Sequence, residues 1–364
     1  MSTPQSASPQ PDSLSVQFLS QGAQTAESIA ERLVTYINGA TQSLDFATYD
    51  FRLSEPLAAM VHDALAQRQA AGVTIRIAYD SDKTQVPPAV AGVDPSTQGT
   101  GVFLAQFGFP AKPIAGLKLM HNKYIIRDAL TPSAMVWTGS TNLTDDAWTL
   151  QENNIVTLTS PTIAQWYRED LEEMWTTGEI GNSGDFETRV APLQFAGQPA
   201  SAQVFFSPGM GEGIDYLVAH RVAAAHRRIR ICSMLLNSGT FLNALLDQLR
   251  RGTVPMDGIY DRTQMADVIT QWQQVPSNHW KIGTLSELVS GANLVGKNST
   301  HYTPTSVHDF MHNKVLVVDD TVITGSYNFS RSAELNAENI LFITSPALAN
   351  QYSAYIDTLK AKYG

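Results

Sequence analysis

Cysteine is nearly absent from this 364-residue sequence, and the single Cys232 excludes an intramolecular disulfide. Cys232 lies in the apolar stretch from Arg230 to Met234, which is typical of a strand, so we expect a small buried side chain rather than a reactive thiol. Hydrophobic residues make up 43% of the chain, which is enough to build a core without covalent cross-links.

Long apolar runs are also missing. No run approaches the roughly 18 residues that a membrane helix needs. The first residues, Met1 to Ser13, are rich in Ser, Pro and Gln and have neither a basic start nor an apolar stretch, which favours a flexible tail over a signal peptide. We therefore expect a soluble, cytoplasmic protein, although a chain trimmed of a leader would look the same.

Positive charge is scarce, with 24 Lys and Arg against 34 Asp and Glu and a formal charge of −10. The field of the whole molecule therefore repels polyanions and anionic membranes. Any anion-binding site must be a local basic pocket.

One order of elements occurs twice in the sequence. Each half is predicted to run strand, helix, strand, helix, strand. The predicted elements are 16–19, 25–40, 44–49, 56–70 and 73–80 in the first half and 203–206, 214–226, 229–232, 240–251 and 258–261 in the second. The pairs Tyr79-Asp80 and Tyr260-Asp261 mark corresponding strand ends.

This alternation predicts an α/β fold made of two duplicated α-β-α sandwich halves, with mixed, largely parallel sheets related by a pseudo-twofold axis. Residues 178–202 are rich in Gly, Pro, Ser and Gln and are predicted to be a linker. The expected boundaries are a flexible tail at 1–14, an N-terminal half at 15–177, this linker, and a C-terminal half at 203–364.

A His-Asn-Lys motif opens an apolar, strand-like run in each half, at His121 and at His312. Residues two apart on a strand point to the same face, so each motif places an imidazole beside an ammonium group. A Gly-Ser-x-Asn segment follows each run, at 139–142 and 325–328. Its glycine permits a tight turn, and its hydroxyl and amide are hydrogen-bond donors that suit phosphate oxygens.

The paired His-x-Lys-x4-Asp and Gly-Ser-x-Asn segments resemble the two signature motifs of the phospholipase D superfamily, over nearly all of residues 15–364. This resemblance implies that one histidine attacks phosphorus to form a phosphohistidine, while the other protonates the leaving oxygen and later activates water. By the family's usual polarity we expect His121 to be the nucleophile and His312 the general acid and base, with the reverse assignment left open.

The resemblance also implies roles for the other motif residues. Orientation of the phosphate oxygens is expected of Lys123, Lys314, Asn142 and Asn328, with help from Ser140 and Ser326. Two ammonium groups at one phosphate make a metal or another cofactor unnecessary. The motif acids Asp128 and Asp319 are expected to anchor strand ends rather than to contact substrate.

The family also tends to carry an acidic residue after Gly-Ser that holds a histidine in one tautomer. Glu338 fits this role in the second half. Glu152 is the candidate in the first half because it lies as far from Ser140 as Glu338 lies from Ser326. Aligning the following strand instead sets Asn153 opposite Glu338.

A metal cluster of His301, His308 and His312 is the main competing interpretation, because His308 and His312 have the spacing of two ligands on one helical face. It is disfavoured because Asp309 and Phe310 fit no metal signature and the first half has no equivalent. The segment before His312 is longer than its first-half counterpart, so we look there for the substrate wall, at Trp272, Trp280 or Tyr302, although each can equally pack within the loop.

The predicted reaction is cleavage of a phosphodiester, with water or an alcohol as the acceptor. A phospholipid is the first substrate considered, and the apolar segments 102–104 and 107–109 could enter a bilayer surface or belong to the core. An endonuclease acting on DNA or RNA is the alternative. A binding module without activity is disfavoured because both motifs are intact. One chain supplies both motifs, so a monomer suffices and no obligate protein partner is expected.

Overall fold

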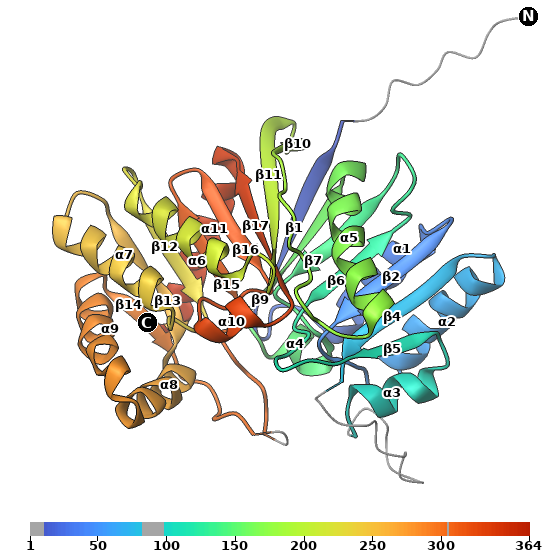
Figure 1. Cartoon of the computed structure of the whole chain (residues 1–364), viewed down its shortest axis with the longest axis horizontal. Helices are drawn as coiled ribbons and strands as arrows, with labels where there is room; N and C mark the ends of the chain where they lie inside the picture. Colours follow the sequence, from blue (N-terminus) through green and yellow to red (C-terminus); the bar gives the residue numbers. More distant parts are fainter. Residues whose placement is uncertain (1–10, 82–97, 304–305) are drawn as a thin grey trace, which may run out of the picture.

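A computed structural model describes residues 11–81, 98–303 and 306–364, and its centre is one continuous fifteen-stranded sheet (Figure 1). The first half supplies the following elements: β1 (Ser13–Leu19), α1 (Ala26–Asn38), β2 (Ser43–Thr48), β3 (Phe51–Arg52), α2 (Leu57–Ala70), β4 (Thr74–Asp80), α3 (Thr100–Phe107), β5 (Ala111–Ile114), β6 (Lys123–Arg127), β7 (Met135–Gly139), β8 (Leu143–Thr144), α4 (Asp145–Thr149), β9 (Asn153–Thr159) and α5 (Pro161–Thr177).

In the described ranges the second half repeats this order with an additional strand, β10, and an additional helix between β13 and β14, and without counterparts of the short strands β3 and β8. Its elements are β10 (Ala191–Phe195), β11 (Gln198–Ser207), α6 (Gly211–Ala223), β12 (Ile229–Ser233), α7 (Gly239–Arg251), β13 (Met256–Asp261), α8 (Arg262–Gln274), the 3-10 turn η2 (Pro276–Asn278), α9 (His279–Gly291), β14 (Leu294–Lys297), β15 (Lys314–Val318), β16 (Thr321–Gly325), α10 (Arg331–Leu335), β17 (Glu338–Thr344) and α11 (Pro346–Tyr363).

The predicted domain boundaries need two corrections. The strand β1 begins at Ser13, so the predicted tail at 1–14 is too long, and residues 1–10 lie outside the described part of the chain. The predicted linker at 178–202 contains β10 and the start of β11, which pair as an antiparallel hairpin. Its Gly, Pro and Ser content suggested a linker, but alternate residues of β10 are buried between the halves.

The strand order is β14-β13-β12-β15-β16-β17-β11-β10-β1-β9-β7-β6-β2-β4-β5. Read outward from β11 or from β1, the two halves have corresponding strands in the same order, which confirms the predicted duplication and the mixed α/β class. Parallel pairs join β2, β4 and β5 and their counterparts β12, β13 and β14, and two short parallel pairs join β1 to β10 and β3 to β8.

The prediction of largely parallel sheets is wrong. The strands from β1 through β9, β7 and β6 to β2 pair antiparallel, as do their counterparts in the second half. One reason is that β6 and β15 are each followed by a short connection to the next strand, β7 or β16, whereas parallel pairing needs a crossover connection. The helix-strand alternation that suggested parallel pairing covers only the start of each half.

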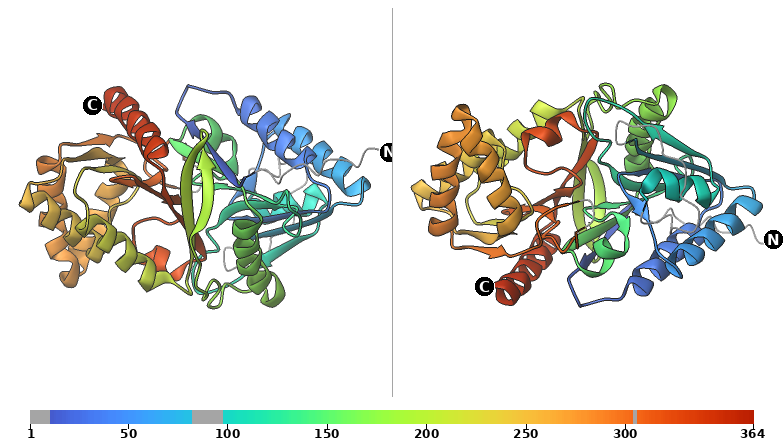
Figure 2. Two further views of the ribbon diagram at one scale, coloured as in Figure 1. Left: turned by 90° about the horizontal axis from the view of Figure 1, so that it is seen from above. Right: turned by 90° about the horizontal axis from the view of Figure 1, so that it is seen from below.

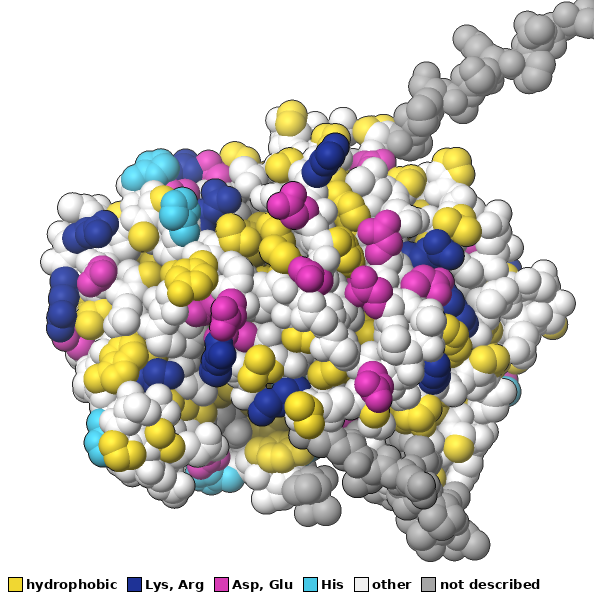
Figure 3. All heavy atoms as spheres, in the orientation of Figure 1, with side chains coloured by type: hydrophobic (Ala, Val, Ile, Leu, Met, Phe, Trp, Pro, Cys, Tyr) yellow, Lys and Arg dark blue, Asp and Glu magenta, His cyan; other side chains and the backbone are white. Residues whose placement is uncertain are grey.

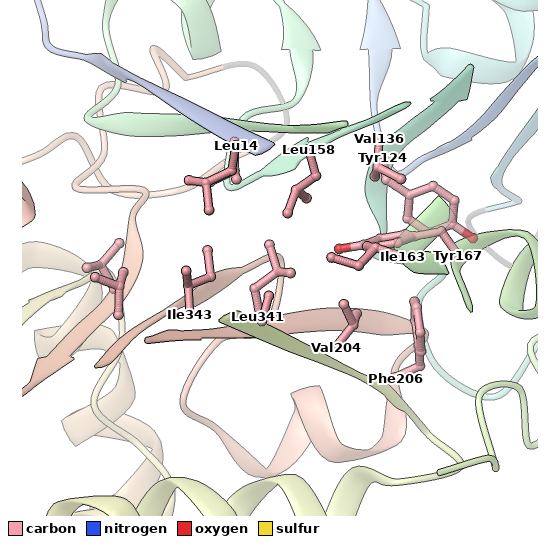
Figure 4. Close-up of a cluster of buried hydrophobic side chains, with 14 of the residues drawn as sticks. Leu14, Tyr124, Val136, Leu158, Ile163, Tyr167, Val204, Phe206, Leu341 and Ile343 are labelled. Atoms are coloured by element: carbon pink, nitrogen blue, oxygen red, sulfur yellow. The ribbon is translucent and has the colours of Figure 1, made fainter. Parts of the chain in front are cut away.

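Three apolar cores hold the molecule together. One lies between α1, α2 and α3 and the first half of the sheet, and a second lies beneath the helices of the second half. The third lies between the halves, where side chains of β1, β7 and β9 face those of β11 and β17 (Figure 4). Helices α5 and α11 close this shared core, and Figure 2 shows them at corresponding places on either side of the central strands.

Helices α5 and α11 begin in the same way. Ser160 and Ser345 each cap their helix by accepting a hydrogen bond from the main chain three residues later, at Ile163 and Leu348, and a proline follows each cap. Buried residues then recur along one face of each helix and pack into the shared core. Among the helices in the described ranges, none combines the length and apolar character that crossing a bilayer requires.

Candidate active site

The two His-Asn-Lys motifs lie at the starts of β6 and β15, of which Lys123 and Lys314 are the first residues. Main-chain hydrogen bonds join the two halves here. The amide of His121 donates to the carbonyl of Ala337 over 2.8 Å, and the amide of Glu152 donates to the carbonyl of Phe310 over 3.0 Å. His121 and His312 are both 7% exposed, and the charges of His121, Lys123 and Lys314 all act on His312. The fold thus brings both predicted motifs into one partly enclosed site.

His121 is oriented by a carboxylate from the opposite half. Its Nδ1 lies 2.7 Å from Oε2 of Glu338, whose Oε1 accepts a hydrogen bond of 3.0 Å from Asn336 Nδ2. An ionised carboxylate only accepts, so Nδ1 of His121 carries the hydrogen and Nε2 keeps its lone pair. Glu338 is fully buried, and its side chain lies where the sequence predicted the histidine's partner.

His312 is oriented by an amide from the opposite half. Its Nδ1 lies 2.9 Å from Oδ1 of Asn153, which also accepts a hydrogen bond of 2.8 Å from Ser140 Oγ. The Asn153 amide nitrogen donates to the carbonyl of Ala147 and to Gln151 Oε1, which fixes Oδ1 as the acceptor. His312 therefore also carries its hydrogen on Nδ1, but its partner is neutral.

The prediction that Glu152 holds this histidine is wrong. Glu152 lies one residue before β9, and successive residues point to opposite sides of a strand. Its carboxylate contacts Lys362 and Lys297 instead. Three residues separate α4 from β9 but only two separate α10 from β17. Counting an equal number of residues from Ser140 therefore gives Glu152, whereas aligning β9 with β17 correctly gives Asn153 as the match of Glu338.

The two motif lysines are buried beside the histidines. Lys123 Nζ donates to the carbonyl of His121 over 2.8 Å, and Lys314 Nζ donates to that of His312 over 2.5 Å. Burial lowers the pKa of Lys123 to about 7, against the opposing charges of Glu338, Asp50 and Asp80, and it lowers the pKa of Lys314 well below its usual range. An anion placed between the two lysines would stabilise their charged forms, which burial otherwise disfavours.

Burial also favours the neutral form of both histidines. It lowers the pKa of His121 to about 4 despite the charge of Glu338, and it lowers that of His312 well below its usual range, with the Lys314 charge as the next cause. Both imidazoles therefore carry a lone pair on Nε2 in the free protein. A bound phosphodiester anion opposes these shifts because it favours protonated neighbours.

The glycines of the two Gly-Ser-x-Asn segments meet a neighbouring strand. Gly139 has φ +129°, and a Cβ there would lie 2.4 Å from the Asn154 carbonyl oxygen; Gly325 has φ +152° and would lie 2.3 Å from that of Asn339. A larger residue would push β7 or β16 away from its neighbour. This close approach of the strands fixes the backbone position from which each following serine and asparagine side chain begins.

The serines act on this neighbouring strand rather than facing outward. Ser140 Oγ accepts from the amide of Asn154 over 2.9 Å and donates to Asn153, while Ser326 Oγ accepts from the amide of Asn339 over 3.0 Å. Both serines are fully buried. Ser140 thereby becomes a positioning residue for the partner of His312.

Asn142 and Asn328 keep unused hydrogen-bonding capacity. The Oδ1 atom of each is buried without a hydrogen-bond partner in the described part of the chain. The two asparagines occupy the same position in the two motifs, so the unpartnered Oδ1 atom is a feature of the repeated motif. An unpartnered Oδ1 can accept a hydrogen bond from a donor of a ligand, and only the Nδ2 group of each asparagine can donate to a phosphate oxygen.

Four carboxylates brace the motifs. Asp128 accepts from the amides of Thr41, Gln42 and Ser43, and Asp319 accepts from those of residues 226–228, so both motif acids hold main chain as predicted. Asp80 and Asp261 bind the amides of Met120 and Met311, directly before each histidine, at 2.5 and 2.9 Å. The binding of these two amides by Asp80 and Asp261 was not predicted from the sequence, although the repeated Tyr79-Asp80 and Tyr260-Asp261 pairs marked the two positions as equivalent.

Tyr49 is a site residue that the sequence analysis missed. Its ring centroid lies 4.7 Å from that of His121, and Lys123 Nζ lies 5.1 Å from the ring. The second half has Met234 at the corresponding position, since both residues donate their amide to the motif asparagine of their own half. An aromatic ring therefore flanks His121, whereas Met234 takes the corresponding position in the second half.

The structure also places the residues of the alternative predictions, which were a metal cluster and a substrate wall. Within residues 11–81, 98–303 and 306–364, no group of three potential metal ligands is found. Trp272 is buried in the second-half core, and Trp280 lies beside Gly239 at the start of α7. Tyr302 is 58% exposed and stacks on His308, with 5.3 Å between the ring centroids.

The segments 102–104 and 107–109 also prove to be core rather than bilayer-facing surface. Phe103, Phe107 and Phe109 are each less than 10% exposed and pack together in the first-half core. Phe107, the last residue of α3, and Phe109, which follows it, both contact His62 of α2, so the suggested entry into a bilayer surface is wrong for these residues.

Comparison with protein-family models gives a match in each half. A model described as "Cardiolipin synthase, PLD-like domain" matches residues 33–175 and 218–360. Each matched segment contains one complete His-Asn-Lys and Gly-Ser-x-Asn pair. A search of curated proteins finds no match.

Solved structures share the fold at low sequence identity. A phosphatidylserine synthase from Haemophilus influenzae Rd KW20 aligns with a TM-score of 0.64 and 14% identity, over 95% of this chain and 86% of that one. A polyphosphate kinase from Porphyromonas gingivalis aligns with a TM-score of 0.56 and 10% identity, over 95% of this chain and 50% of that one. The phospholipase D family member Nuc from Salmonella typhimurium covers 45% of this chain and 95% of its own, at 20% identity and a TM-score of 0.33.

Proposed function

The chain belongs to the phospholipase D-like family, with one copy of the family's domain in each half, and we propose from this premise that it is a phosphodiesterase that works through a phosphohistidine without a metal. The observation that carries the proposal is the pairing of His121 with Glu338, which leaves Nε2 of a buried histidine with a free lone pair beside two lysines. Such an atom is a nucleophile for phosphorus.

In the first step His121 Nε2 attacks phosphorus. The P–N bond forms as the bond from phosphorus to the leaving oxygen breaks, and that oxygen takes the Nε2 proton of His312, which binds this proton when the phosphodiester anion enters the site. In the second step neutral His312 removes a proton from water, whose oxygen attacks phosphorus and displaces His121. Transfer to an alcohol follows the same step with the alcohol in place of water.

The two histidines differ in a way that supports this division. The negative charge of Glu338 stabilises the positive imidazole that forms when His121 binds phosphorus. The neutral Asn153 gives His312 no such stabilisation, so His312 releases a proton more readily. Nucleophilic attack therefore suits His121, and proton exchange suits His312.

Lys123 and Lys314 would neutralise the phosphate oxygens, and Asn142 and Asn328 would orient them. The lysines are held by main-chain carbonyls, so their geometry is set before substrate binds. Because both halves contribute to one site, a single chain suffices for this reaction.

A phospholipid is the substrate that we propose first. The matching family model is described as a cardiolipin synthase domain, and the fold is similar to that of a phosphatidylserine synthase. On the face seen in Figure 3, Lys and Arg side chains are interspersed with Asp and Glu rather than gathered into the basic stripe typical of nucleic-acid binding.

A nuclease is the second candidate, and one observation favours it. The exposed ring of Tyr302 is stacked on His308, two residues before Phe310 and four before His312. Aromatic rings of this kind can stack on the bases of a single strand.

The test is turnover of bis(p-nitrophenyl) phosphate in the presence of a chelator, followed by phospholipid vesicles and by single-stranded and duplex DNA. We expect turnover in chelator, loss of activity in His121→Ala and His312→Ala, and phosphate trapped on protein that contains His121. Chelator-sensitive turnover, or no cleavage of any of these substrates, contradicts the proposal. Cleavage of DNA but not of vesicles selects the nuclease.

A further inference from the structure

Glu152 is a fully buried carboxylate held by residues from the end of the chain. Its Oε1 lies 3.1 Å from Lys362 Nζ and 3.8 Å from Lys297 Nζ, and it accepts a hydrogen bond from the hydroxyl of Tyr363. Lys297 is only 1% exposed, and both lysines lie 5.0 Å from the ring of Tyr363. We call Glu152, Lys297, Lys362 and Tyr363 the C-terminal clamp.

The clamp joins Glu152 of the first half to residues of the second half, and the positions that match Glu152 and Lys297 in the reciprocal contact carry no charge. The position that matches Glu152 is Ala337, as shown by the pairing of their neighbours with the two motif histidines. Lys297 pairs with Asp261 at the end of β14, whereas Ile114 pairs with Asp80 at the matching end of β5. Because the reciprocal contact between the halves has Ala337 and Ile114 at these positions, the shared fold does not require the charges of the clamp.

The clamp is joined directly to the partner of His312. Glu152 precedes Asn153, the residue that accepts from His312, and its amide binds the carbonyl of Phe310, two residues before His312. Helix α11, which carries Lys362, also carries Tyr355. The Tyr355 hydroxyl lies 3.0 Å from the carbonyl of Leu19, which is the strand partner of Asn153. It also lies 3.1 Å from Asn313 Nδ2. Both sides of the His312–Asn153 hydrogen bond are therefore attached to α11.

We propose that the C-terminal clamp positions Asn153 against His312 and so controls the reaction steps that need His312. This inference rests on the proposed phosphohistidine mechanism for its kinetic consequence. The lysines hold the carboxylate of Glu152 on the side of the strand away from the site, which keeps a neutral amide, not a second carboxylate, beside His312. The clamp residues are positioning residues because they contact neither histidine.

The two steps of the reaction need His312 unequally. p-Nitrophenolate is a stable leaving group, so attack by His121 on bis(p-nitrophenyl) phosphate needs little proton donation. Water is a poor nucleophile, so hydrolysis of the phosphohistidine needs His312 as a base. Loss of the clamp should slow the second step much more than the first.

The kinetic experiment compares Tyr363→Phe and Lys362→Met with wild type in a rapid-quench burst assay on bis(p-nitrophenyl) phosphate. Tyr363→Phe keeps the ring and removes only the hydroxyl. We expect the burst to keep its amplitude of about one per site while the steady-state rate falls about tenfold. The control is Arg250→Ala, which breaks the exposed Arg250–Glu287 ion pair between α7 and α9 and should leave both phases unchanged.

A spectroscopic measurement tests the clamp without relying on turnover. Nitrogen-15 spectra of labelled histidine, assigned with His312→Gln, report which ring nitrogen of His312 carries the hydrogen. We expect Nδ1–H in wild type and a mixture of tautomers in both clamp variants, with His121 unchanged.

The outcomes separate the two proposals. An unchanged His312 spectrum in both variants, or a burst and a steady-state rate that fall by the same factor, overturns the clamp's positioning role. Wild type that yields no trapped phosphohistidine overturns the proposed mechanism, and the spectra still decide whether the clamp orients His312.

Discussion

The imidazole of His121 donates a hydrogen bond to the carboxylate of Glu338 across 2.7 Å, although the two residues are 217 positions apart and lie in opposite halves of the chain. His312 and Asn153 form the reciprocal pair across 159 positions. Each half therefore contributes one histidine and the residue that orients the other half's histidine. The site is symmetric in its geometry and asymmetric in its charge.

Glu338→Gln should lower kcat by at least about 100-fold, because an amide cannot stabilise the positive charge that develops on His121 during attack. The loss should appear in the burst phase, which reports formation of the phosphohistidine. Rapid-quench kinetics measure it. A normal burst followed by slow hydrolysis would instead assign the nucleophile to His312.

Asn153→Asp should move the alkaline limb of the pH–rate profile to higher pH. A carboxylate 2.9 Å from Nδ1 favours the protonated form of His312, so its pKa rises and the general acid stays protonated at higher pH. The measurement is kcat/KM for an alkyl phosphodiester between pH 5 and 9. An unmoved alkaline limb contradicts the role of His312 as the acid.

Ser140→Ala should reduce kcat about tenfold and destabilise the fold by about 1 kcal/mol, because the variant loses the donor that fixes Asn153 Oδ1. Ser326→Ala is its matched control. The Ser326 hydroxyl binds the main chain of Asn339 and contacts neither histidine's partner, so a similar loss of stability should leave kcat nearly unchanged. Equal losses of activity in the two variants would refute this difference.

Lys123→Met should abolish activity but raise the thermal unfolding midpoint at pH 7. Burial holds the pKa of Lys123 at about 7, below its usual value of 10.5, so the unfolded chain binds more protons and stability rises as the pH increases between these values. The gain from Lys123→Met should therefore be largest at pH 7 and below and should shrink towards pH 10. Thermal unfolding across this range measures the difference, and a gain that is independent of pH would contradict it.

Gly139→Ala should destabilise the protein by about 1–3 kcal/mol, since the new methyl group meets the Asn154 carbonyl and the positive φ disfavours any larger residue. Gly252→Ala is a useful control because Gly252 also has a positive φ, +66°, but has open space around its Cβ position. The excess cost at Gly139 isolates the steric contact. Equal unfolding midpoints of the two variants would show that the contact is relieved elsewhere.

The sequence predicted the duplication and the motif residues because both depend on short-range patterns. His121 and Lys123 are two residues apart at the start of β6, and this relation holds whatever surrounds the strand. The parallel pairing and the linker were wrong because they depend on how distant segments meet. Nothing local to 191–202 shows that these residues form the hairpin at the centre of the sheet.

Glu152 illustrates the same limit at the site. One additional residue between α4 and β9 shifts the register, so the carboxylate faces Lys297 and Lys362 while the amide of Asn153 faces His312. Neither lysine is near Glu152 in the sequence. The second role of Asp80 and Asp261 was missed for a related reason, since their partners at Met120 and Met311 are 40 and 50 positions away.

The exchange of partners between the halves also constrains how this chain can evolve. A substitution at Glu338 or Asn153 acts on the histidine encoded in the other repeat, so neither repeat could specialise alone after the duplication. The two copies therefore had to diverge as a pair, because His121, the proposed nucleophile, lies in one repeat and Glu338, which orients it, lies in the other.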